Sequence, residues 1–343
     1  MQRSLEDLWY RQPPGHSWLT VLARGYGAVM SARRGAYARG WLRPQHVGAP
    51  VIVVGNLTVG GTGKTPLVIW LASELGRRGL EVGIVSRGYG RHEVGPRLVE
   101  ERATWRAVGD EPLILHRRTG CPTAVAADRA VAAGLLVVRG AEVILADDGL
   151  QHLRLARQCE IVVIDGARGF GNGRMLPAGP LREGIARLGA ADAVVVNGRL
   201  EHESLRQLAS LGAGAPLSMR LEAGEAWRLD STERAPLERF RARPVHAVAG
   251  IGNPQRFFRE LRARGLEPIE HPYPDHHPLT APELDFGDDL PVLMTEKDAV
   301  KCAPIEGRDL WYVPVEAQLP EDDARRLIET VMRRIESFPS SGG

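Results

Sequence analysis

The stretch VIVVGNLTVGGTGKTP, residues 51–66, decides the fold that we expect for this chain. It reads as a buried strand, then a glycine-rich loop ending in Gly-Lys-Thr, then the start of a helix. Backbone N–H groups of such a loop, together with the helix N-terminus, form a cradle for phosphate. Lys64 is placed to reach the β- and γ-phosphates, and the Thr65 hydroxyl is placed to bind Mg²⁺. The predicted nucleotide-binding residues of the loop are Gly60, Gly61, Thr62, Gly63, Lys64 and Thr65.

Strand-like and helical segments alternate along the rest of the chain. Further short apolar runs lie at 82–86, 141–146, 161–164 and 194–196. This alternation predicts an α/β fold of the phosphate-loop NTPase type over residues 46–215, with a mostly parallel sheet flanked by helices. Residues 216–243 read as an extended linker. The alternation restarts over residues 244–343, which we expect to form a second, smaller α/β domain.

Composition narrows the class of protein. The chain has 343 residues, of which 43% are hydrophobic and 25% charged, as in globular proteins. A net charge of +2 argues against a general nucleic-acid binder. The three cysteines lie far apart without a Cys-x-x-Cys pair, which fits a reducing cytoplasm. No apolar run approaches the roughly 18 residues of a membrane-spanning helix, and no secretory signal is evident.

Residues 1–45 interleave aromatic, apolar and basic side chains. The first 43 residues contain seven arginines against only Glu6 and Asp7. From Ser17 to Ser31 the apolar positions approximate one face of a helix. A basic amphipathic helix with tryptophan near its ends suits a membrane interface. The alternative is a helix that packs on the protein's own core with its arginines in solvent.

A second chemical element follows the apolar run at 141–146. Asp147 and Asp148 come directly after it, with Gln151 and His152 close behind. An apolar strand that ends in carboxylates is the usual form of the second metal-site element in phosphate-loop enzymes. Carboxylate, amide and imidazole groups within six residues can hold Mg²⁺ directly or through water.

Phosphoryl transfer also needs a group that accepts or orients the proton of the attacking hydroxyl. Asp110, which precedes a helical run, is one candidate, although helix capping alone would explain it. The cluster Asp275-His276-His277 is another, because an imidazole beside a carboxylate titrates near neutral pH. That cluster could instead form a metal site with His271, or its histidines could simply pack in a proline-rich loop.

Taken in order, the motifs resemble those of the tetraacyldisaccharide 4'-kinase (lipid A 4'-kinase) family over about residues 10–330. The guanine-specificity motif Asn-Lys-x-Asp is absent, which favours ATP over GTP. The motifs that carry the resemblance are residues 55–66, Ser86-Arg87-Gly88-Tyr89-Gly90, Gly109-Asp110-Glu111-Pro112, Asp147-Asp148-Gly149-Leu150-Gln151-His152, Pro180-Leu181-Arg182-Glu183, Gly252-Asn253-Pro254, Asp275-His276-His277 and Thr295-Glu296-Lys297-Asp298.

The resemblance implies transfer of the γ-phosphate of ATP to the 4'-hydroxyl of a tetraacylated glucosamine disaccharide 1-phosphate, the lipid A disaccharide precursor. It implies a peripheral enzyme on the cytoplasmic face of the inner membrane. By resemblance, Asp110 is the catalytic aspartate and works with His276 or His277 from the second domain. The group that organises Mg²⁺-ATP near Lys64 and Thr65 is Asp147, Asp148, Gln151, His152 and Glu183.

The chain departs from its relatives in small ways. Leu150 and Gly184 stand where phenylalanine and proline are common, and neither change removes a polar group. The loop also resembles those of partitioning-type ATPases, but Val59 replaces the lysine that acts across their dimer. We therefore expect a monomer and no nucleotide-sandwich dimer. Two other functions remain open at this point, a nucleotide-switch NTPase of the metallochaperone type and a membrane-surface scaffold.

Overall fold

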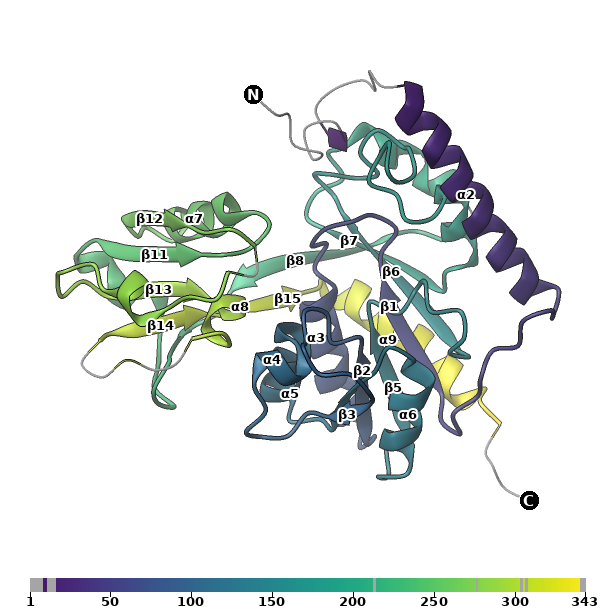
Figure 1. The fold of residues 1–343 in the computed structure, drawn as a ribbon, viewed down its shortest axis with the longest axis horizontal. Helices are drawn as coiled ribbons and strands as arrows, with labels where there is room; N and C mark the ends of the chain where they lie inside the picture. The colour runs from purple at the N-terminus through teal and green to yellow at the C-terminus, as the bar shows by residue number, and fades with distance from the viewer. Residues whose placement is uncertain are drawn as a thin grey trace.

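The computed structural model describes residues 9–10, 17–211, 214–275, 277–302, 305 and 308–339. It contains two sheets that lie side by side along the long axis of the molecule (Figure 1). The larger has nine strands in the order β15-β8-β7-β6-β1-β5-β2-β4-β3, and the smaller has six in the order β10-β9-β14-β13-β11-β12. From β8 to β4 the strands of the large sheet run parallel, while β15 and β3 pair antiparallel at its edges. The expected mostly parallel α/β fold is confirmed.

The large domain uses elements from the beginning, middle and end of the chain. Its helices are α2 (Ser17–Ala38), α3 (Lys64–Gly76), α4 (Trp105–Val108), α5 (Asp110–Thr119), α6 (Arg129–Val137), η1 (Ile185–Ala190), η2 (Glu203–Leu211) and α9 (Glu321–Glu336). Its strands are β1 (Val51–Gly55), β2 (Val82–Ser86), β3 (Arg97–Leu98), β4 (Thr123–Val125), β5 (Val143–Asp147), β6 (Cys159–Asp165), β7 (Ala193–Asn197), β8 (Leu217–Ala223) and β15 (Val315–Gln318).

The smaller domain is formed by the residues between β8 and β15. Its strands are β9 (Ala226–Arg228), β10 (Arg234–Ala235), β11 (Val245–Ala249), β12 (Pro268–Pro272), β13 (Val292–Thr295) and β14 (Leu310–Val313). Its helices are η3 (Leu237–Ala242), α7 (Pro254–Ala263), η4 (Ala281–Leu284) and α8 (Glu296–Ala299). A core of apolar side chains, which includes Phe258 and Trp311, lies between this sheet and its helices.

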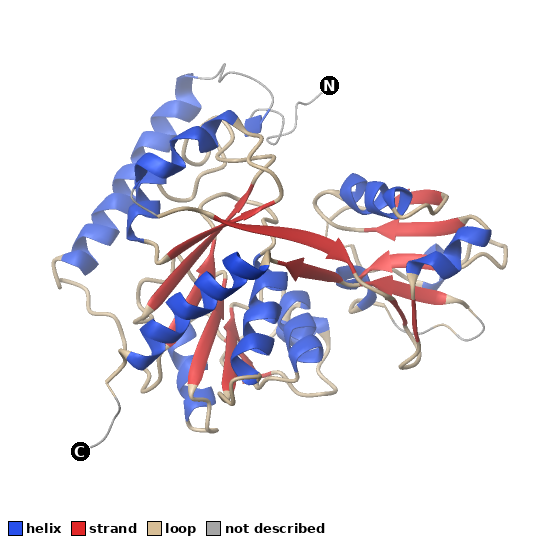
Figure 2. Cartoon of the chain, turned by 180° about the vertical axis from the view of Figure 1, so that it is seen from behind, coloured by secondary structure: helices blue, strands red, loops and turns tan. Residues whose placement is uncertain are grey.

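Helices cover both faces of the large sheet (Figure 2). Successive residues of β1 point to opposite faces, so Val51 and Val53 enter one core and Ile52 and Val54 the other. The helix α6 packs on the first face, while α3 and α9 pack on the second. A strand buried on both faces must be apolar throughout, which explains the uninterrupted run in the sequence.

The domain boundaries differ from those expected. Residues 216–243 are not a separate linker, because β8 pairs with β7 in the large sheet and β9 belongs to the small one. Residues 244–343 are not wholly in the smaller domain, because α9 packs on the large one. The amphipathic pattern of α9 reveals a buried face, but not which domain that face covers. The two domains are joined by β8 and β15, which pair antiparallel as they pass between the sheets (Figure 1).

The helix expected over residues 17–31 is present and extends to Ala38 as α2. Its inner side packs Leu19 and Ala23 against Ala178 of the large domain. Its outer side exposes a row of apolar side chains, Trp18, Val21, Leu22 and Val29, at helical spacing. Among the residues described, no helix combines the length and apolar character needed to cross a membrane.

Candidate functional site

The glycine-rich loop joins β1 to α3 at the carboxyl edge of the large sheet. Lys64 and Thr65 occupy the first turn of α3, and Gly63 precedes it with φ 98°. A side chain at position 63 would be strained, and its Cβ would lie 3.0 Å from Nδ2 of Asn197. Asn197 ends β7 and donates that nitrogen to the Thr62 carbonyl at 3.1 Å. The neighbouring strand therefore fixes the loop in a shape that only glycine permits at position 63.

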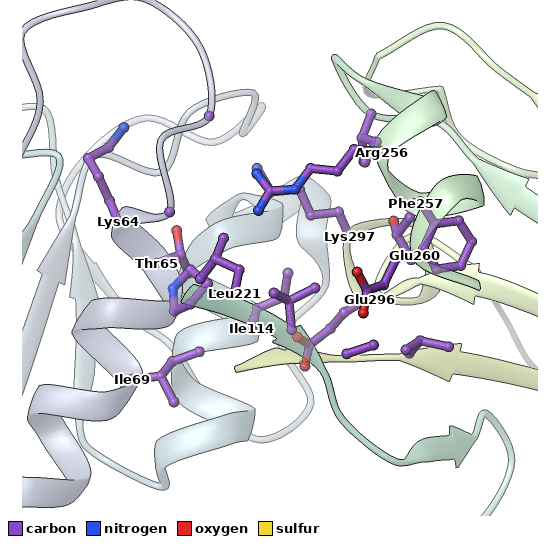
Figure 3. Close-up of a pocket in the computed structure, with 18 of the residues that line it drawn as sticks. Lys64, Thr65, Ile69, Ile114, Leu221, Arg256, Phe257, Glu260, Glu296 and Lys297 are labelled. Carbon is purple, nitrogen blue, oxygen red and sulfur yellow. The ribbon is translucent and has the colours of Figure 1, made fainter. Parts of the chain in front are cut away.

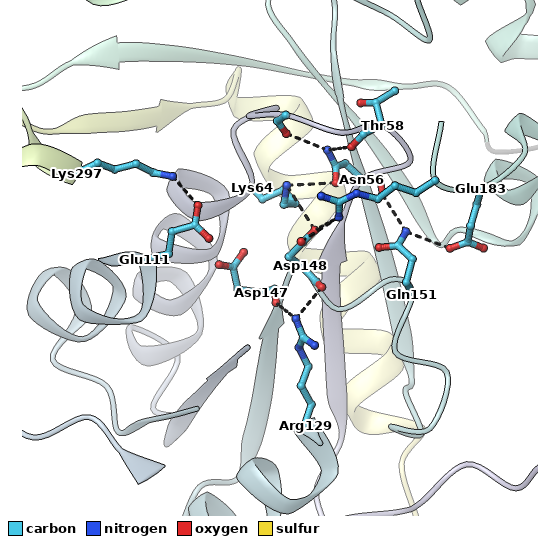
Figure 4. Close-up of polar contacts among 12 residues, drawn as sticks. Asn56, Thr58, Lys64, Glu111, Arg129, Asp147, Asp148, Gln151, Glu183 and Lys297 are labelled. Carbon is cyan, nitrogen blue, oxygen red and sulfur yellow. Dashed lines mark hydrogen bonds and ion pairs between the residues drawn. The ribbon is translucent and has the colours of Figure 1, made fainter. Parts of the chain in front are cut away.

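Asn56 organises the loop from within. Its buried Nδ2 donates to the Thr58 carbonyl at 2.8 Å, and its Oδ1 accepts from Nζ of Lys64 at 3.2 Å (Figure 4). Gln151 Nε2 reaches both the Asn56 carbonyl at 3.2 Å and Oε1 of Glu183 at 3.1 Å. The structure thus brings together Lys64, Gln151 and Glu183, which the family resemblance implies to lie at the nucleotide site. It adds Asn56, for which the motif gave no role.

Asp147 ends β5, the strand beside β1, and Asp148 follows it directly. The carboxyl groups of the two residues have opposite electrostatic surroundings. Burial, reinforced by Glu111, raises the pKa of Asp147 to about 7. Burial opposes ionisation of Asp148 as well, but Lys64 and Arg182 lower the pKa of Asp148 to about 2. At neutral pH, Asp148 is therefore ionised, whereas Asp147 is only partly ionised.

The Asp147 side chain is ready to accept a cation. It is 1% exposed, and neither of its carboxylate oxygens has a hydrogen-bond partner in the described structure. A buried carboxylate without a partner is costly, and Mg²⁺ characteristically takes one or two carboxylates together with substrate phosphates. The orphaned oxygens of Asp147 beside Asp148 therefore fit a magnesium ion. Thr65, whose hydroxyl is predicted to bind Mg²⁺, lies in the first turn of the neighbouring α3.

Arg129, which no sequence motif singled out, supports the backbone of the aspartate pair. Its buried guanidinium donates to the carbonyls of Asp147 at 3.3 Å and Asp148 at 2.9 Å (Figure 4). Asp148 has φ 47°, a left-handed conformation that is uncommon for aspartate. The two hydrogen bonds from Arg129 hold the backbone in that turn and so direct both carboxylates.

His152 has cationic surroundings. Burial, together with Arg129 and Arg87, lowers the pKa of His152 to about 3, so its imidazole is neutral at physiological pH. The same charges that repel a proton disfavour a metal cation and favour an anion. The predicted ligation of Mg²⁺ by His152 thus finds less support in its surroundings than ligation by Asp147 does.

Asp110 begins α5 on the side of the loop that faces the smaller domain. It is buried, and its Oδ1 accepts from the backbone N–H of Glu111 at 2.8 Å. The N-cap position itself is taken by Gly109, so helix capping does not account for Asp110. The Glu111 carboxylate pairs with Nζ of Lys297 from the smaller domain at 2.5 Å (Figure 4). An ion pair between Glu111 and Lys297 therefore joins the two domains beside Asp110.

The predicted histidines lie in the smaller domain. His276 falls outside the described residues. His277 is bonded through Nε2 to Oε1 of Glu283 at 2.7 Å and stacks on Tyr273. His271 pairs instead with His246, at 2.9 Å between ring nitrogens. Within the described ranges there is no group of three or more His, Cys, Asp or Glu side chains placed to hold a metal ion.

A cavity of about 270 Å³ adjoins the glycine-rich loop between the two domains (Figure 3). Its floor is residues 61–66, and its walls come from both domains. Apolar side chains such as Ile69, Leu221 and Phe257 line much of it, while Arg256 and Lys297 supply charge. An apolar cavity beside a phosphate-binding loop can hold the flat ring system of a nucleotide base.

Comparison with known proteins decides the family. The family model described as tetraacyldisaccharide-1-P 4'-kinase matches residues 15–334. The chain belongs to this family. The tetraacyldisaccharide 4'-kinase of Alkalilimnicola ehrlichii is 49% identical over 338 residues, covering 97% of this chain and 98% of that protein. That of Xanthomonas euvesicatoria pv. vesicatoria is 47% identical over 314 residues, covering 91% of each protein.

A solved structure in the same kinase family agrees with the fold. The crystal structure of the "apo" form of LpxK from Aquifex aeolicus in complex with ATP has a TM-score of 0.77 and 28% sequence identity to this chain. The match covers 93% of this chain and 99% of that one. The kinase family inferred from the ordered motifs is confirmed, and so is the phosphate-loop α/β fold. The metallochaperone-type alternative receives no support from these comparisons.

Proposed function

We propose that the protein transfers the γ-phosphate of ATP to the 4'-hydroxyl of tetraacyldisaccharide 1-phosphate at the edge of the large sheet. Membership of the tetraacyldisaccharide-1-P 4'-kinase family supports the reaction. The convergence of Lys64, Asp148 and Asp147 beside the loop carries the assignment of the site. Lys64 Nζ lies 3.5 Å from Asp148 Oδ1 and bonds Asn56, so its charge is positioned before any phosphate arrives.

Asp147, Asp148 and Thr65 are the residues that would hold Mg²⁺. When bound, the metal neutralises phosphate charge during transfer. Lys64 and the backbone N–H groups of the loop orient the phosphates. Gln151 donates to Glu183 and to the Asn56 carbonyl, and Asn56 in turn accepts from Lys64 and so maintains its position. The adjoining apolar cavity takes the base of ATP, and its position between the domains lets both contribute contacts.

Asp110 accepts the proton of the attacking hydroxyl. It is buried at the start of α5, and its Oδ1 is already oriented by the N–H of Glu111. A histidine of the 275–277 segment assists it. His276 is the preferred candidate, because the ring of His277 is bonded to Glu283.

The outer side of α2 is the surface that meets the lipid. Its exposed apolar row and the arginines of the same helix suit the boundary between head groups and acyl chains. The helix also approaches the site, since the Tyr26 hydroxyl donates to the Arg182 carbonyl at 3.2 Å. The protein would therefore work as a peripheral enzyme on the cytoplasmic face of the inner membrane, drawing its acylated acceptor from that surface as a monomer.

A γ-phosphate transfer assay with a lipid A disaccharide precursor tests the proposal. Lys64→Ala and Asp110→Ala should each reduce 4'-phosphorylation about 100-fold or more, as loss of a positioned transition-state group does. Asp230→Ala removes an exposed carboxylate of the smaller domain that pairs with Arg228, far from the glycine-rich loop in sequence, and it should leave the rate unchanged. Full activity in both the Lys64 and Asp110 variants would reject the site.

A further inference from the structure

The short helix α8 lies against α5, the helix that carries Asp110. Each end of α5 is paired with α8. In its first turn Glu111 meets Lys297, and in its last turn Arg118 Nη1 lies 3.1 Å from Oε2 of Glu296. Val300, just after α8, also packs against the apolar cluster that includes Leu113 of α5. The smaller domain thus holds α5 by two ion pairs and an apolar contact.

α8 itself is held rigidly. Asp298 is fully buried, and its Oδ2 accepts from the Thr295 hydroxyl at 2.6 Å and from the Gly250 N–H at 3.0 Å. Its other oxygen pairs with Nζ of Lys301 at 3.2 Å. These bonds tie the end of β13 to the end of β11. These bonds therefore hold α8, and with it Glu296 and Lys297, in a fixed position.

Lys297 is connected to Asp110 by two consecutive contacts. Its Nζ lies 2.5 Å from Oε1 of Glu111, and the backbone N–H of Glu111 donates to Oδ1 of Asp110 at 2.8 Å. Burial lowers the pKa of Lys297, but the nearby carboxylates of Glu111, Asp110 and Asp275 more than offset this and raise it. Lys297 is therefore a permanent cation among carboxylates that come from both domains.

We propose that Lys297 is a positioning residue for the kinase reaction, which acts through Glu111 to set the orientation of Asp110. Through this connection the docking of the smaller domain on α5 controls whether the acceptor's proton can be taken. Arg118, at the far end of the same helix, contributes to docking without touching the first turn. The inference rests on the role proposed for Asp110, whose own test is the Asp110→Asn variant.

A double-mutant cycle tests the connection. Lys297→Met should lower kcat at saturating ATP by about 10- to 100-fold, since misplacement of a reacting group affects the transition state. Lys297→Arg retains the charge and should restore most of kcat. If Lys297 acts through Glu111, adding Glu111→Gln to Lys297→Met should cost less than about threefold more.

Arg118→Met is the matched control for general loosening of the domain contact. Its effect should multiply with that of Lys297→Met, because the two pairs lie at opposite ends of α5. Thermal unfolding checks that each variant folds. An unchanged kcat in Lys297→Met, a loss confined to KM, or an equal loss in Lys297→Arg would each overturn the proposal. Full activity in Asp110→Asn would reject the role of Asp110 itself, whatever the result at Lys297.

Discussion

At the carboxyl end of β5 a polar group is buried without a partner, whereas on the outer side of α2 apolar side chains are exposed. At the first, Asp147 buries a carboxyl group whose oxygens find no partner in the described structure. At the second, Trp18 is 61% exposed and Val29 65% exposed, although both are apolar. Each arrangement costs free energy in the isolated protein, the one through lost hydration and the other through apolar surface left in water.

The difference supports the partner that we propose for each region. A cation would relieve the first cost, and a hydrocarbon boundary would relieve the second. Neighbouring residues have the same costs removed internally, since Asp148 is paired with Lys64 and Arg182, and Leu19 on the inner side of α2 is covered by Ala178. Each region therefore contains a neighbouring residue for which the same cost is absent, and the Asp148 variant below makes use of the first.

The largest expected effect comes from Asp147→Asn. Phosphate transfer should fall about 100- to 1000-fold, because a charge at the reacting phosphates is lost. The free protein should nevertheless be more stable at pH 8, by on the order of 1–3 kcal/mol, because it no longer has to ionise a buried carboxyl group whose pKa is raised. Kinase assays and denaturant unfolding measure the two effects.

Asp148→Asn is the control for that prediction. The pKa of Asp148 is lowered, so its charge stabilises the fold above its unfolded pKa, and this contribution disappears as the pH falls toward 2. Its removal should lower stability at neutral pH. A gain in stability in both variants, or in neither, would mean that the two carboxyl groups are not distinguished as described.

The second prediction concerns protons. With a pKa near 7, Asp147 is largely protonated at pH 6 and must lose its proton to ligate a metal. Binding of magnesium-ATP at pH 6 should therefore release up to about one proton, and at pH 8 almost none. Calorimetry in two buffers of different ionisation enthalpy counts the protons. Equal release at the two pH values, or in the Asp147→Asn variant, would contradict the assignment.

The third prediction replaces the exposed row of α2. The combined change Trp18→Ser, Val21→Ser and Leu22→Ser should weaken binding to anionic vesicles by at least about tenfold, because each buried apolar side chain contributes on the order of 1 kcal/mol or more. Stability in solution should change by less than about 0.5 kcal/mol, since these side chains make no core contact.

Val138, an exposed apolar residue at the end of α6, is the control for that row. Val138→Ser should leave vesicle sedimentation unchanged. Equal sedimentation of the wild-type protein and the triple variant would reject α2 as the lipid-facing surface.

The smallest effect is expected from the charge on the same helix. Arg24→Gln removes one exposed arginine and should lower affinity for anionic vesicles about fivefold, since a basic residue near such a surface contributes about 1 kcal/mol. Affinity for uncharged vesicles should be unaffected. A loss of the same size on uncharged vesicles would show that the arginine acts through packing and not through charge.

The sequence predicted the parts of the site that depend on local order. The glycine-rich loop and the Asp147-Asp148 pair each follow a run of buried strand residues, and parallel strands bring their carboxyl ends to one edge. The residues that it missed act across long separations. Arg129 reaches carbonyl groups 18 and 19 positions away, and Lys297 meets Glu111 across 186 positions. No spacing pattern encodes such contacts.

The domain boundaries predicted from the sequence were wrong for a similar reason, because they also depend on contacts between residues far apart in the chain. The strand–helix alternation after residue 244 identifies elements but not the sheet to which each belongs. β8 and β15 are strands of the large sheet that continue toward the small one, and composition does not distinguish this from a linker. Likewise, the apolar face of α9 matches either domain until Leu327 and Val331 are seen against the core beside α3.

The return of α9 to the large domain has a consequence for synthesis. One face of the nucleotide-binding sheet is covered by α3 near residue 70 and by α9 near residue 330. A chain emerging from the ribosome can complete the smaller domain, which is contiguous between β8 and β15, while the sheet that began first still has an open apolar face. The large domain would then become stable only after α9 has left the ribosome. A chain truncated within α9 should therefore aggregate soon after its synthesis.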